Sequence, residues 1–159
     1  MSHGDPERRA SIAIDSALHN IALVGLAVKG ICTQLPFDEK TAFQLELCVV
    51  EAVTNVVKHA YQGQAGQEVA VSLAVGTDRL VITITDHGRP GLCLDAPRRA
   101  VEPAGLDAAP EGGVGLVIIN TVMDSVEYSS EEGRNVLRLV KWFSHGGGGE
   151  SGQGDGLAG

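Results

Sequence analysis

The sequence predicts an α/β fold, a two-layer sandwich in which a mixed, mostly antiparallel sheet carries helices on one face. Residues 69–75 and 80–84 place an apolar side chain at every second position, which is typical of half-buried strands. Two stretches, residues 16–34 and 39–59, have the length and apolar content of helices. The predicted order along the chain is β-α-α-β-β-α-β-β, so neighbouring strands can pair as hairpins while the helices gather on one side.

The first third of the chain predicts one strand and two helices. Residues 10–14 alternate and indicate a short strand, and Asp15 or Ser16 is suited to cap the helix that follows. Pro36 and Asp38 mark a turn and a second cap, after which a helix runs from Glu39 to His59. The first helix runs to Gln34, and its predicted apolar side is Leu18, Ile21, Leu26 and Ile31.

The rest of the chain predicts two hairpins around a third helix. The link Gly76-Thr77-Asp78 joins the two alternating runs as a hairpin. Residues 87–112 are rich in Pro, Ala and Gly without an apolar period, and a loop of that length is usually functional or disordered. Residues 114–124 predict a buried helix, and a last hairpin pairs residues 125–130 with residues 134–143.

Length and composition predict one soluble domain. Of the 159 residues, 43% are hydrophobic and 20% charged, and we expect a domain over 10–145, a flexible N-terminus (1–9) and a disordered Gly-rich tail (146–159). The net charge of −8, without a basic stripe, argues against direct nucleic-acid binding. No apolar run reaches membrane-spanning length and no signal-peptide core is present, which favours a cytoplasmic protein. The scattered Cys32, Cys48 and Cys93 indicate free thiols rather than a zinc site or disulfides.

The most informative segment is the nearly all-apolar helix of residues 46–61. Its polar residues Glu51, Asn55 and His59 are spaced i, i+4, i+8, so an α-helix would place them on one stripe. Burying a carboxylate and an amide costs free energy unless each has a partner, so we expect a ligand, a metal or hydrogen bonds opposite that stripe. The alternative is an exposed polar edge on an amphipathic helix.

Two other segments are suited to ligand binding. Asp86-His87-Gly88-Arg89-Pro90-Gly91 follows a buried strand, where a carboxylate and glycines allow close approach of backbone to a ligand, although the same residues also make plain turns. Gly112-Gly113-Val114-Gly115-Leu116 opens a helix, whose N-terminal N–H groups favour phosphate, although glycines also serve as ordinary joints. Neither a Walker A loop nor a Rossmann fingerprint is present.

Taken together and in this order, the three segments resemble the GHKL superfamily of histidine-kinase-like ATP-binding domains, which share the Bergerat fold. Within that superfamily the chain is most similar to bacterial anti-sigma-factor serine/threonine kinases of the RsbW type. The resemblance covers roughly residues 10 to 143. It rests on the strings from Glu51 to Tyr61, Asp86 to Pro90 and Gly112 to Leu116, with further matches at 123–128 and 133–138.

The resemblance implies a role for each of these segments. Asn55 would ligate the Mg²⁺ that bridges the phosphates of ATP, and Glu51 would act as general base on the substrate hydroxyl. Asp86 would accept a hydrogen bond from the adenine amino group beside Gly88, and His59 would orient the site or simply end the helix. The remaining expected nucleotide-binding positions are Pro90, Gly91, Arg98, Arg99, Gly112, Gly113, Val114, Gly115, Leu116 and Asn135, with residues 92–111 as a lid.

Two of these positions depart from the wider superfamily. Pro90 replaces the second glycine of Asp-x-Gly-x-Gly, and Arg134-Asn135 stands where a threonine is often found near the adenine. For Arg98 and Arg99 the alternative to a contact with the γ-phosphate is a solvated basic pair.

The function implied by the resemblance is an ATP-dependent kinase that phosphorylates Ser or Thr on an anti-anti-sigma protein of the STAS class and sequesters a sigma factor. A homodimer is implied by the same resemblance. Two alternatives stay open: a module that binds nucleotide and sequesters its partner without phosphoryl transfer, and a detached catalytic domain of a histidine kinase. Only about ten residues precede the first predicted strand, which disfavours the last of these.

Overall fold

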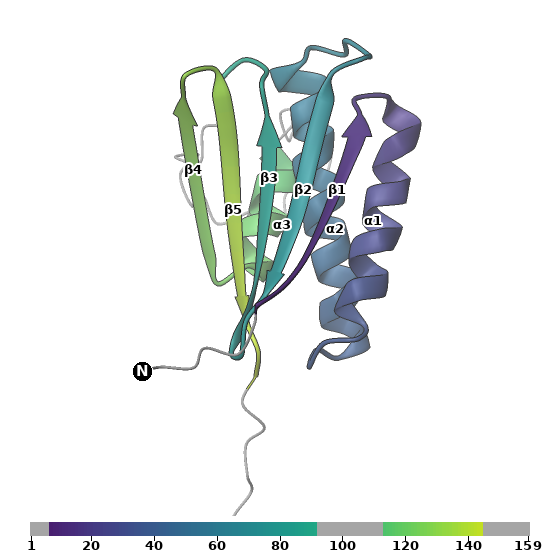
Figure 1. Ribbon diagram of the computed structural model, residues 1–159, viewed down its shortest axis with the longest axis vertical. Helices are drawn as coiled ribbons and strands as arrows, with labels where there is room; N and C mark the ends of the chain where they lie inside the picture. Colours follow the sequence, from purple (N-terminus) through teal and green to yellow (C-terminus); the bar gives the residue numbers. More distant parts are fainter. Residues whose placement is uncertain (1–6, 92–112, 145–159) are drawn as a thin grey trace, which may run out of the picture.

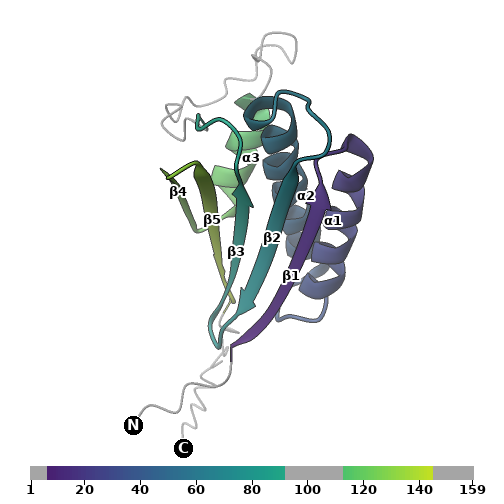
Figure 2. The ribbon, with the colours of Figure 1, turned by 45° about the horizontal axis from the view of Figure 1, so that its top comes forward.

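The computed structural model describes residues 7–91 and 113–144. A five-stranded sheet forms one layer, and the helices cover one of its faces (Figure 1; Figure 2). The order of elements confirms the predicted β-α-α-β-β-α-β-β. They are β1 (Arg8–Asp15), α1 (Leu18–Cys32), α2 (Glu39–Asn55), the π-helical turn η1 (Val56–Ala60), β2 (Glu68–Val75), β3 (Arg79–Asp86), α3 (Gly113–Val122), β4 (Ser125–Glu131) and β5 (Arg134–Trp142).

The sheet is antiparallel throughout, where the sequence predicted a mixed one. Its strand order is β1-β2-β3-β5-β4, and every neighbouring pair runs antiparallel. The chain leaves β3, crosses the sheet through α3 and enters β4 at the far edge, and β5 then fills the space between them (Figure 1). The strands β3 and β4 point the same way, but they are not neighbours and form no parallel ladder.

The core lies between the sheet and the helices, as the alternation predicted. The inward positions of β2 and β3 are buried aliphatic side chains except the last, Asp86, and the outward positions between them are half-buried. The hairpin at Gly76-Thr77-Asp78 is confirmed, with the Gly76 N–H donating to the Arg79 carbonyl at 2.9 Å. The largest fully buried side chains come from both layers: Leu45, Leu73, Leu80, Ile82, Ile84, Ile119 and Leu139.

The predicted apolar face of α1 was partly wrong. Leu18 and Leu26 are each 62% exposed, Ile31 is half-buried and only Ile21 of the four lies in the core. The buried stripe follows the spacing i, i+3, i+4, i+7, i+11 and consists of Ile21, Val24, Gly25, Val28 and Cys32. Gly25 lets α2 approach closely, because a Cβ at this position would lie 2.7 Å from Val50 Cγ2.

The predicted cap of α1 was also wrong, because both candidate side chains bind the loop before β2. Ser16 Oγ donates to the Gln64 carbonyl at 2.6 Å and accepts from the Gln67 N–H, and Asp15 Oδ1 accepts from the Gly66 N–H. The N-cap is Ala17, without a side-chain hydrogen bond. The second predicted cap is confirmed, since Asp38 Oδ1 accepts from the Thr41 N–H at 2.7 Å at the start of α2.

The second predicted helix keeps α-helical bonding only to Asn55, not to His59. From Val56 the chain forms a π-helical turn, in which the Tyr61 N–H bonds the carbonyl of Val56, five residues back, at 2.9 Å. The remaining differences from the predicted elements lie at their ends, since β1 begins at Arg8, α1 ends at Cys32 and α3 ends at Val122. Such shifts of one or two residues are the usual uncertainty of helix and strand ends.

Candidate functional site

A buried polar network lies where β3 ends beside β5. Asp86 and Asn135 are directly opposite each other in the β3–β5 register, and they are 2% and 1% exposed. The Asn135 amide nitrogen donates to Asp86 Oδ1 at 2.8 Å and to the Gly88 carbonyl at 3.0 Å. Asp86 Oδ1 also accepts from the Gly88 N–H at 2.9 Å. One oxygen of this carboxylate is therefore fully engaged, which leaves Oδ2 as the acceptor available to a ligand.

The turn after Asp86 is fixed by the end of the π-turn. The Arg89 N–H donates to the Ala60 carbonyl at 2.9 Å, and the His87 N–H donates to the Tyr61 hydroxyl at 2.9 Å. Gly88 is pressed against η1, because a Cβ at this position would lie 2.5 Å from the Ala60 carbonyl oxygen and 2.6 Å from its carbon. The predicted close approach at Gly88 therefore involves the chain's own backbone.

The helix α2 carries Glu51, the predicted catalytic residue, and Asn55, the predicted metal ligand. Glu51 is half-buried and Asn55, one turn further, is 5% exposed. The Asn55 amide makes no hydrogen bond to the residues that the structure describes, so its oxygen is free to take a ligand. Gly115 packs on Glu51 from α3, where an added Cβ would lie 2.5 Å from Glu51 Oε2. The start of α3 therefore meets the carboxylate directly.

The third residue of the predicted stripe does not follow the other two. His59 lies on η1 and is exposed. A π-turn has more residues per turn than an α-helix, so four residues after Asn55 no longer return to the same face. The i, i+4, i+8 stripe therefore ends at Asn55. Single π-turns within helices occur frequently at functional sites.

The other predicted positions are scattered around this centre. Pro90 and Gly91 are exposed, and the Gly91 N–H lies 3.3 Å from the Tyr128 hydroxyl on β4. Gly113 opens α3, Val114 is 55% exposed and Leu116 is half-buried. Arg98, Arg99 and Gly112, the whole of the predicted lid (92–111) and the Gly-rich tail lie outside the described residues.

Two further residues, Tyr61 and Ser130, belong to the network, and the sequence alone did not predict a role for either. Tyr61 is buried, and its hydroxyl donates to the Glu68 carbonyl at 2.6 Å while accepting from His87. Burial raises the pKa of Tyr61, which keeps the hydroxyl protonated as a donor. A buried tyrosine at a helix end signals such a partner, because its hydroxyl needs one. Ser130 donates to Asn135 Oδ1 at 2.7 Å, and only the β4–β5 register brings these residues together.

These groups fit a nucleotide with its metal ion. Asp86 Oδ2 supplies an acceptor for an amino group, Asn55 supplies a neutral oxygen for a hard cation, and the N-terminus of α3 supplies N–H groups for phosphate. Within residues 7–91 and 113–144 no group of three or more His, Cys, Asp or Glu is placed to hold a metal by itself. In nucleotide sites Mg²⁺ takes few protein ligands and is held largely by phosphates and water, and the Asn55 oxygen would supply one of the protein ligands.

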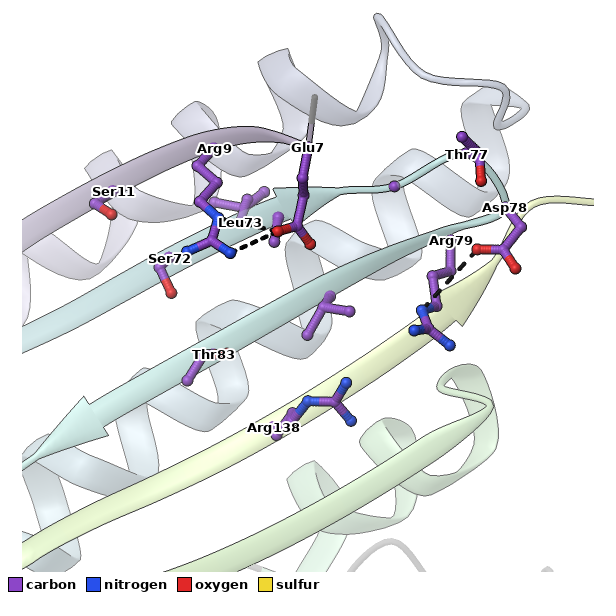
Figure 3. Close-up of a pocket in the computed structure, with 13 residues that line it drawn as sticks. Glu7, Arg9, Ser11, Ser72, Leu73, Thr77, Asp78, Arg79, Thr83 and Arg138 are labelled. Carbon is purple, nitrogen blue, oxygen red and sulfur yellow. Dashed lines mark hydrogen bonds and ion pairs between the residues drawn. The ribbon is translucent and has the colours of Figure 1, made fainter. Parts of the chain in front are cut away.

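A separate hollow lies on the other side of the sheet. Figure 3 shows Arg9, Ser11, Ser72, Thr83 and Arg138 on the outer face, away from the helices. None of the residues around Asp86 or Asn55 lines it.

In the described part of the chain no helix is long and apolar enough to cross a membrane.

Comparison with known proteins identifies the family and supports the fold. Residues 14–141 match the family model of the histidine kinase-like ATPase domain. The serine-protein kinase RsbW of Halalkalibacterium halodurans is 35% identical over 77% of this chain and 76% of its own length. RsbW of Listeria monocytogenes is 31% identical over 78% of this chain and 80% of its own length. A crystal structure of the RsbU and RsbW domains of Rv1364c from Mycobacterium tuberculosis matches with a TM-score of 0.60 at 13% identity, covering 84% of this chain and 31% of that one.

The match over residues 14–141 shows that the chain belongs to the histidine kinase-like ATPase family. Within that family it belongs with the serine-protein kinases named RsbW, whose matched relatives it resembles over about four fifths of its length. The predicted family and fold are both confirmed by these findings.

Proposed function

We propose that this protein transfers the γ-phosphate of ATP to a serine or threonine of an anti-anti-sigma protein of the STAS class, and that it sequesters a sigma factor according to the state of that partner. The observation that carries the proposal is the placement of Glu51 and Asn55 one turn apart on α2, with Gly115 of α3 packed on the Glu51 carboxylate. The names of the relatives support the reaction class.

Each part of the site has a task in this reaction. Asp86 Oδ2 accepts a hydrogen bond from the amino group of adenine, while Gly88 keeps the turn close to Ala60. Gly113 and Gly115 place the N-terminus of α3 at the phosphates, where the helix dipole favours negative charge. Asn55 would hold Mg²⁺, which would supply charge neutralisation at the phosphates.

Glu51 acts on the acceptor hydroxyl. Its carboxylate orients the serine or threonine hydroxyl and takes its proton as the oxygen attacks phosphorus in line. The new bond joins the hydroxyl oxygen to phosphorus, and the bond from phosphorus to the β,γ-bridging oxygen breaks, which releases ADP. Gly115 matters here because any larger side chain would push Glu51 out of its position.

We also propose a cytoplasmic homodimer. The helices cover one face of the sheet, and the outer face carries short side chains such as Ser11, Ser72 and Thr83 (Figure 3). This uncovered face of the sheet is the surface available to a second copy. Sedimentation equilibrium tests the assembly, with a mass of twice 16.5 kDa expected.

The kinase proposal is tested with labelled ATP, Mg²⁺ and a panel of STAS-domain proteins from the same genome. Acid-stable label is expected on one of them. Glu51→Gln should lower the rate by about 10²–10⁴-fold while ATP still binds, and Asn55→Ala should weaken binding of ATP with Mg²⁺. Glu39→Gln is the matched control, since Glu39 lies at the other end of α2.

The other outcomes separate the alternatives. Phosphoryl transfer at the normal rate by Glu51→Gln would show that Glu51 is not the general base. ATP binding without label on any partner would favour the sequestration module, and acid-labile label would indicate a histidine acceptor.

A further inference from the structure

A lysine lies on the inner face of the sheet, at the end of β5 far from the polar network. Alternation along the strand puts Lys141 on the same face as the buried Leu137 and Leu139, whereas Asn135 stands on that face at the opposite end. The Lys141 side chain is 23% exposed. An ammonium group on an apolar face needs a polar partner, because burying an unpaired charge costs free energy.

The partner of Lys141 is the end of a helix. Its Nζ donates to the carbonyl of Val122, the last residue of α3, at 2.6 Å. The same ammonium lies 3.6 Å from Asp124 Oδ1, just beyond the helix. The last carbonyls of a helix have no partner within it, and a positive charge is favourable at this end of the helix dipole. Lys141 therefore closes the C-terminus of α3.

Other contacts of α3 hold it less specifically. In the part of the chain that the structure describes, the bond from Lys141 is the one hydrogen bond between α3 and another element. The side chains of Asn120 and Thr121 bond carbonyls of α3 itself. The buried Ile119 and Val122 make apolar contacts, which are non-directional and do not fix the position of the helix along its axis.

The other end of α3 has no side chain to anchor it. Gly113 and Gly115 begin the helix, and Gly115 meets Glu51 by close packing alone. The helix has ten residues, so it is about 15 Å long and moves as a short rod. The place where its C-terminus is held therefore decides where the N–H groups of its first turn lie.

We propose that Lys141 is a positioning residue for the phosphate site: by holding the last carbonyl of α3, it sets where the N-terminus of that helix meets the phosphates of ATP. This inference rests on the proposed function, in which Gly113 and Gly115 lie at the phosphates.

The base and the phosphates should respond differently to the loss of Lys141. Asp86, which receives the base, is held by the Asn135 amide and the Gly88 N–H, and neither bond involves α3. A shift of α3 would therefore weaken the binding of phosphates and leave the binding of the base unchanged.

The test compares ATP with adenosine, which has the base but no phosphates. On the full chain, ATP affinity is measured by titration calorimetry with Mg²⁺, and adenosine affinity by competition against labelled ATP. Lys141→Met keeps most of the apolar stem and loses the ammonium. It should bind ATP about tenfold more weakly and adenosine as the wild type does. Lys141→Arg keeps a charged donor and should restore most of the ATP affinity.

Arg138→Met is the matched control for the lost charge. It removes one positive charge from the same strand, nearer Asn135, but on the outer face, where Arg138 pairs with Glu127 at 3.5 Å. Long-range attraction of ATP would be lost at least as much in this variant, whose ATP affinity should nevertheless match the wild type. Lys141→Gln is shorter and uncharged, and it replaces Lys141→Met, with the same expected loss, if that variant does not fold by circular dichroism.

The inference and the proposed function fail in different ways. Unchanged ATP affinity in the folded variant, or an equal fall for ATP and adenosine, would overturn the inference. An equal loss of ATP affinity in Arg138→Met would also overturn it, because the lost charge alone would then explain the result. A wild-type protein that binds ATP no more tightly than adenosine would overturn the proposed phosphate site itself.

Discussion

At the scale of single residues, two glycines allow close packing in the site because they have no side chain. Gly115 meets the Glu51 carboxylate, and Gly88 meets the backbone of Ala60. The neighbour differs in the two cases. Glu51 is a flexible side chain that can yield to a methyl group, whereas the carbonyl of Ala60 is backbone and belongs to the π-turn. A side chain is therefore least tolerable at Gly88.

We predict that Gly88→Ala lowers the affinity for ATP at least tenfold, which corresponds to about 1.4 kcal/mol. The added methyl group must displace the turn, because it would lie 2.5 Å from the Ala60 carbonyl oxygen. Titration calorimetry with Mg²⁺ and ATP measures the change.

The matched control for this change is Gly30→Ala in α1. Nothing lies within 4 Å of a Cβ at Gly30, so that variant should bind ATP normally and gain about 0.5–1 kcal/mol of stability from the helix. Wild-type affinity in Gly88→Ala would show that the turn can shift without cost to the base site.

The site residues also differ in how far the sequence could predict them. Glu51 and Asn55 were identifiable because a carboxylate and an amide stand inside an apolar helix, and Asp86 because a carboxylate before a glycine ends a buried strand. Asn135 was identifiable only as a departure from the family pattern, since its partners, Asp86 and Ser130, are distant in sequence or set by strand register. Register depends on how strands pair across the sheet, and one strand by itself does not contain it.

At the scale of elements, α2 carries both Glu51 and Asn55, so the precision of the site depends on how firmly this helix is held. Its core side chains pack on the sheet, and its first turn is closed by Asp38. The far end is closed differently, by a π-turn whose last carbonyl binds Arg89 in the turn after β3. The Asp38 cap and the alternation of the strands could be read from the sequence, but the π-turn has no such local signal.

We predict that Asp38→Ala lowers the melting temperature by about 2–4 °C, because the Thr41 N–H loses its acceptor. Asp38→Asn should keep the cap and the melting temperature near pH 7. Thermal unfolding followed by circular dichroism measures both variants.

Wild type and Asp38→Asn should differ in stability at acid pH. Hydrogen bonds from the Thr41 side chain and backbone lower the pKa of Asp38 below 3.8 in the folded state. The stabilisation from this carboxylate is therefore present above pH 3.8 and is lost as the pH falls through the lowered value. Asp38→Asn has no such carboxylate and should lose less stability over that range. Equal acid sensitivity of wild type and Asp38→Asn would contradict the assignment.

At the scale of the whole molecule, one apolar core joins the sheet to the helices, and two thiols lie inside it. Cys32 and Cys48 are fully buried. Burial raises the pKa of Cys32 to about 11 and that of Cys48 to about 12, from an ordinary value of 9.0. The predicted free thiols are confirmed for these two residues, and Cys93 lies outside the described part of the chain.

We predict that these thiols make the folded state sensitive to alkali. Because the folded pKa values lie above 9.0, the unfolded chain loses its thiol protons first as the pH rises. The free energy of unfolding should therefore receive the full contribution of the two thiols below about pH 9 and lose it progressively between pH 9 and 12. Denaturant titrations across this range measure the loss.

The control is a Cys32→Ala/Cys48→Ala protein. Other groups that titrate in alkali are the same in both proteins, so the difference between their pH profiles isolates the thiols. A parallel decline in both proteins would show that the thiols contribute nothing.

The antiparallel register determines where both described ends of the chain leave the sheet. Arg8 pairs with Val75 and Trp142 pairs with Arg79, so both described ends of the chain leave the sheet beside the Gly76-Thr77-Asp78 hairpin. Asp86 and Asn135 pair at the opposite end. A fluorophore, a solid support or a neighbouring domain attached beside Arg8 or Trp142 would therefore lie at the end of the sheet opposite Asp86 and Asn135.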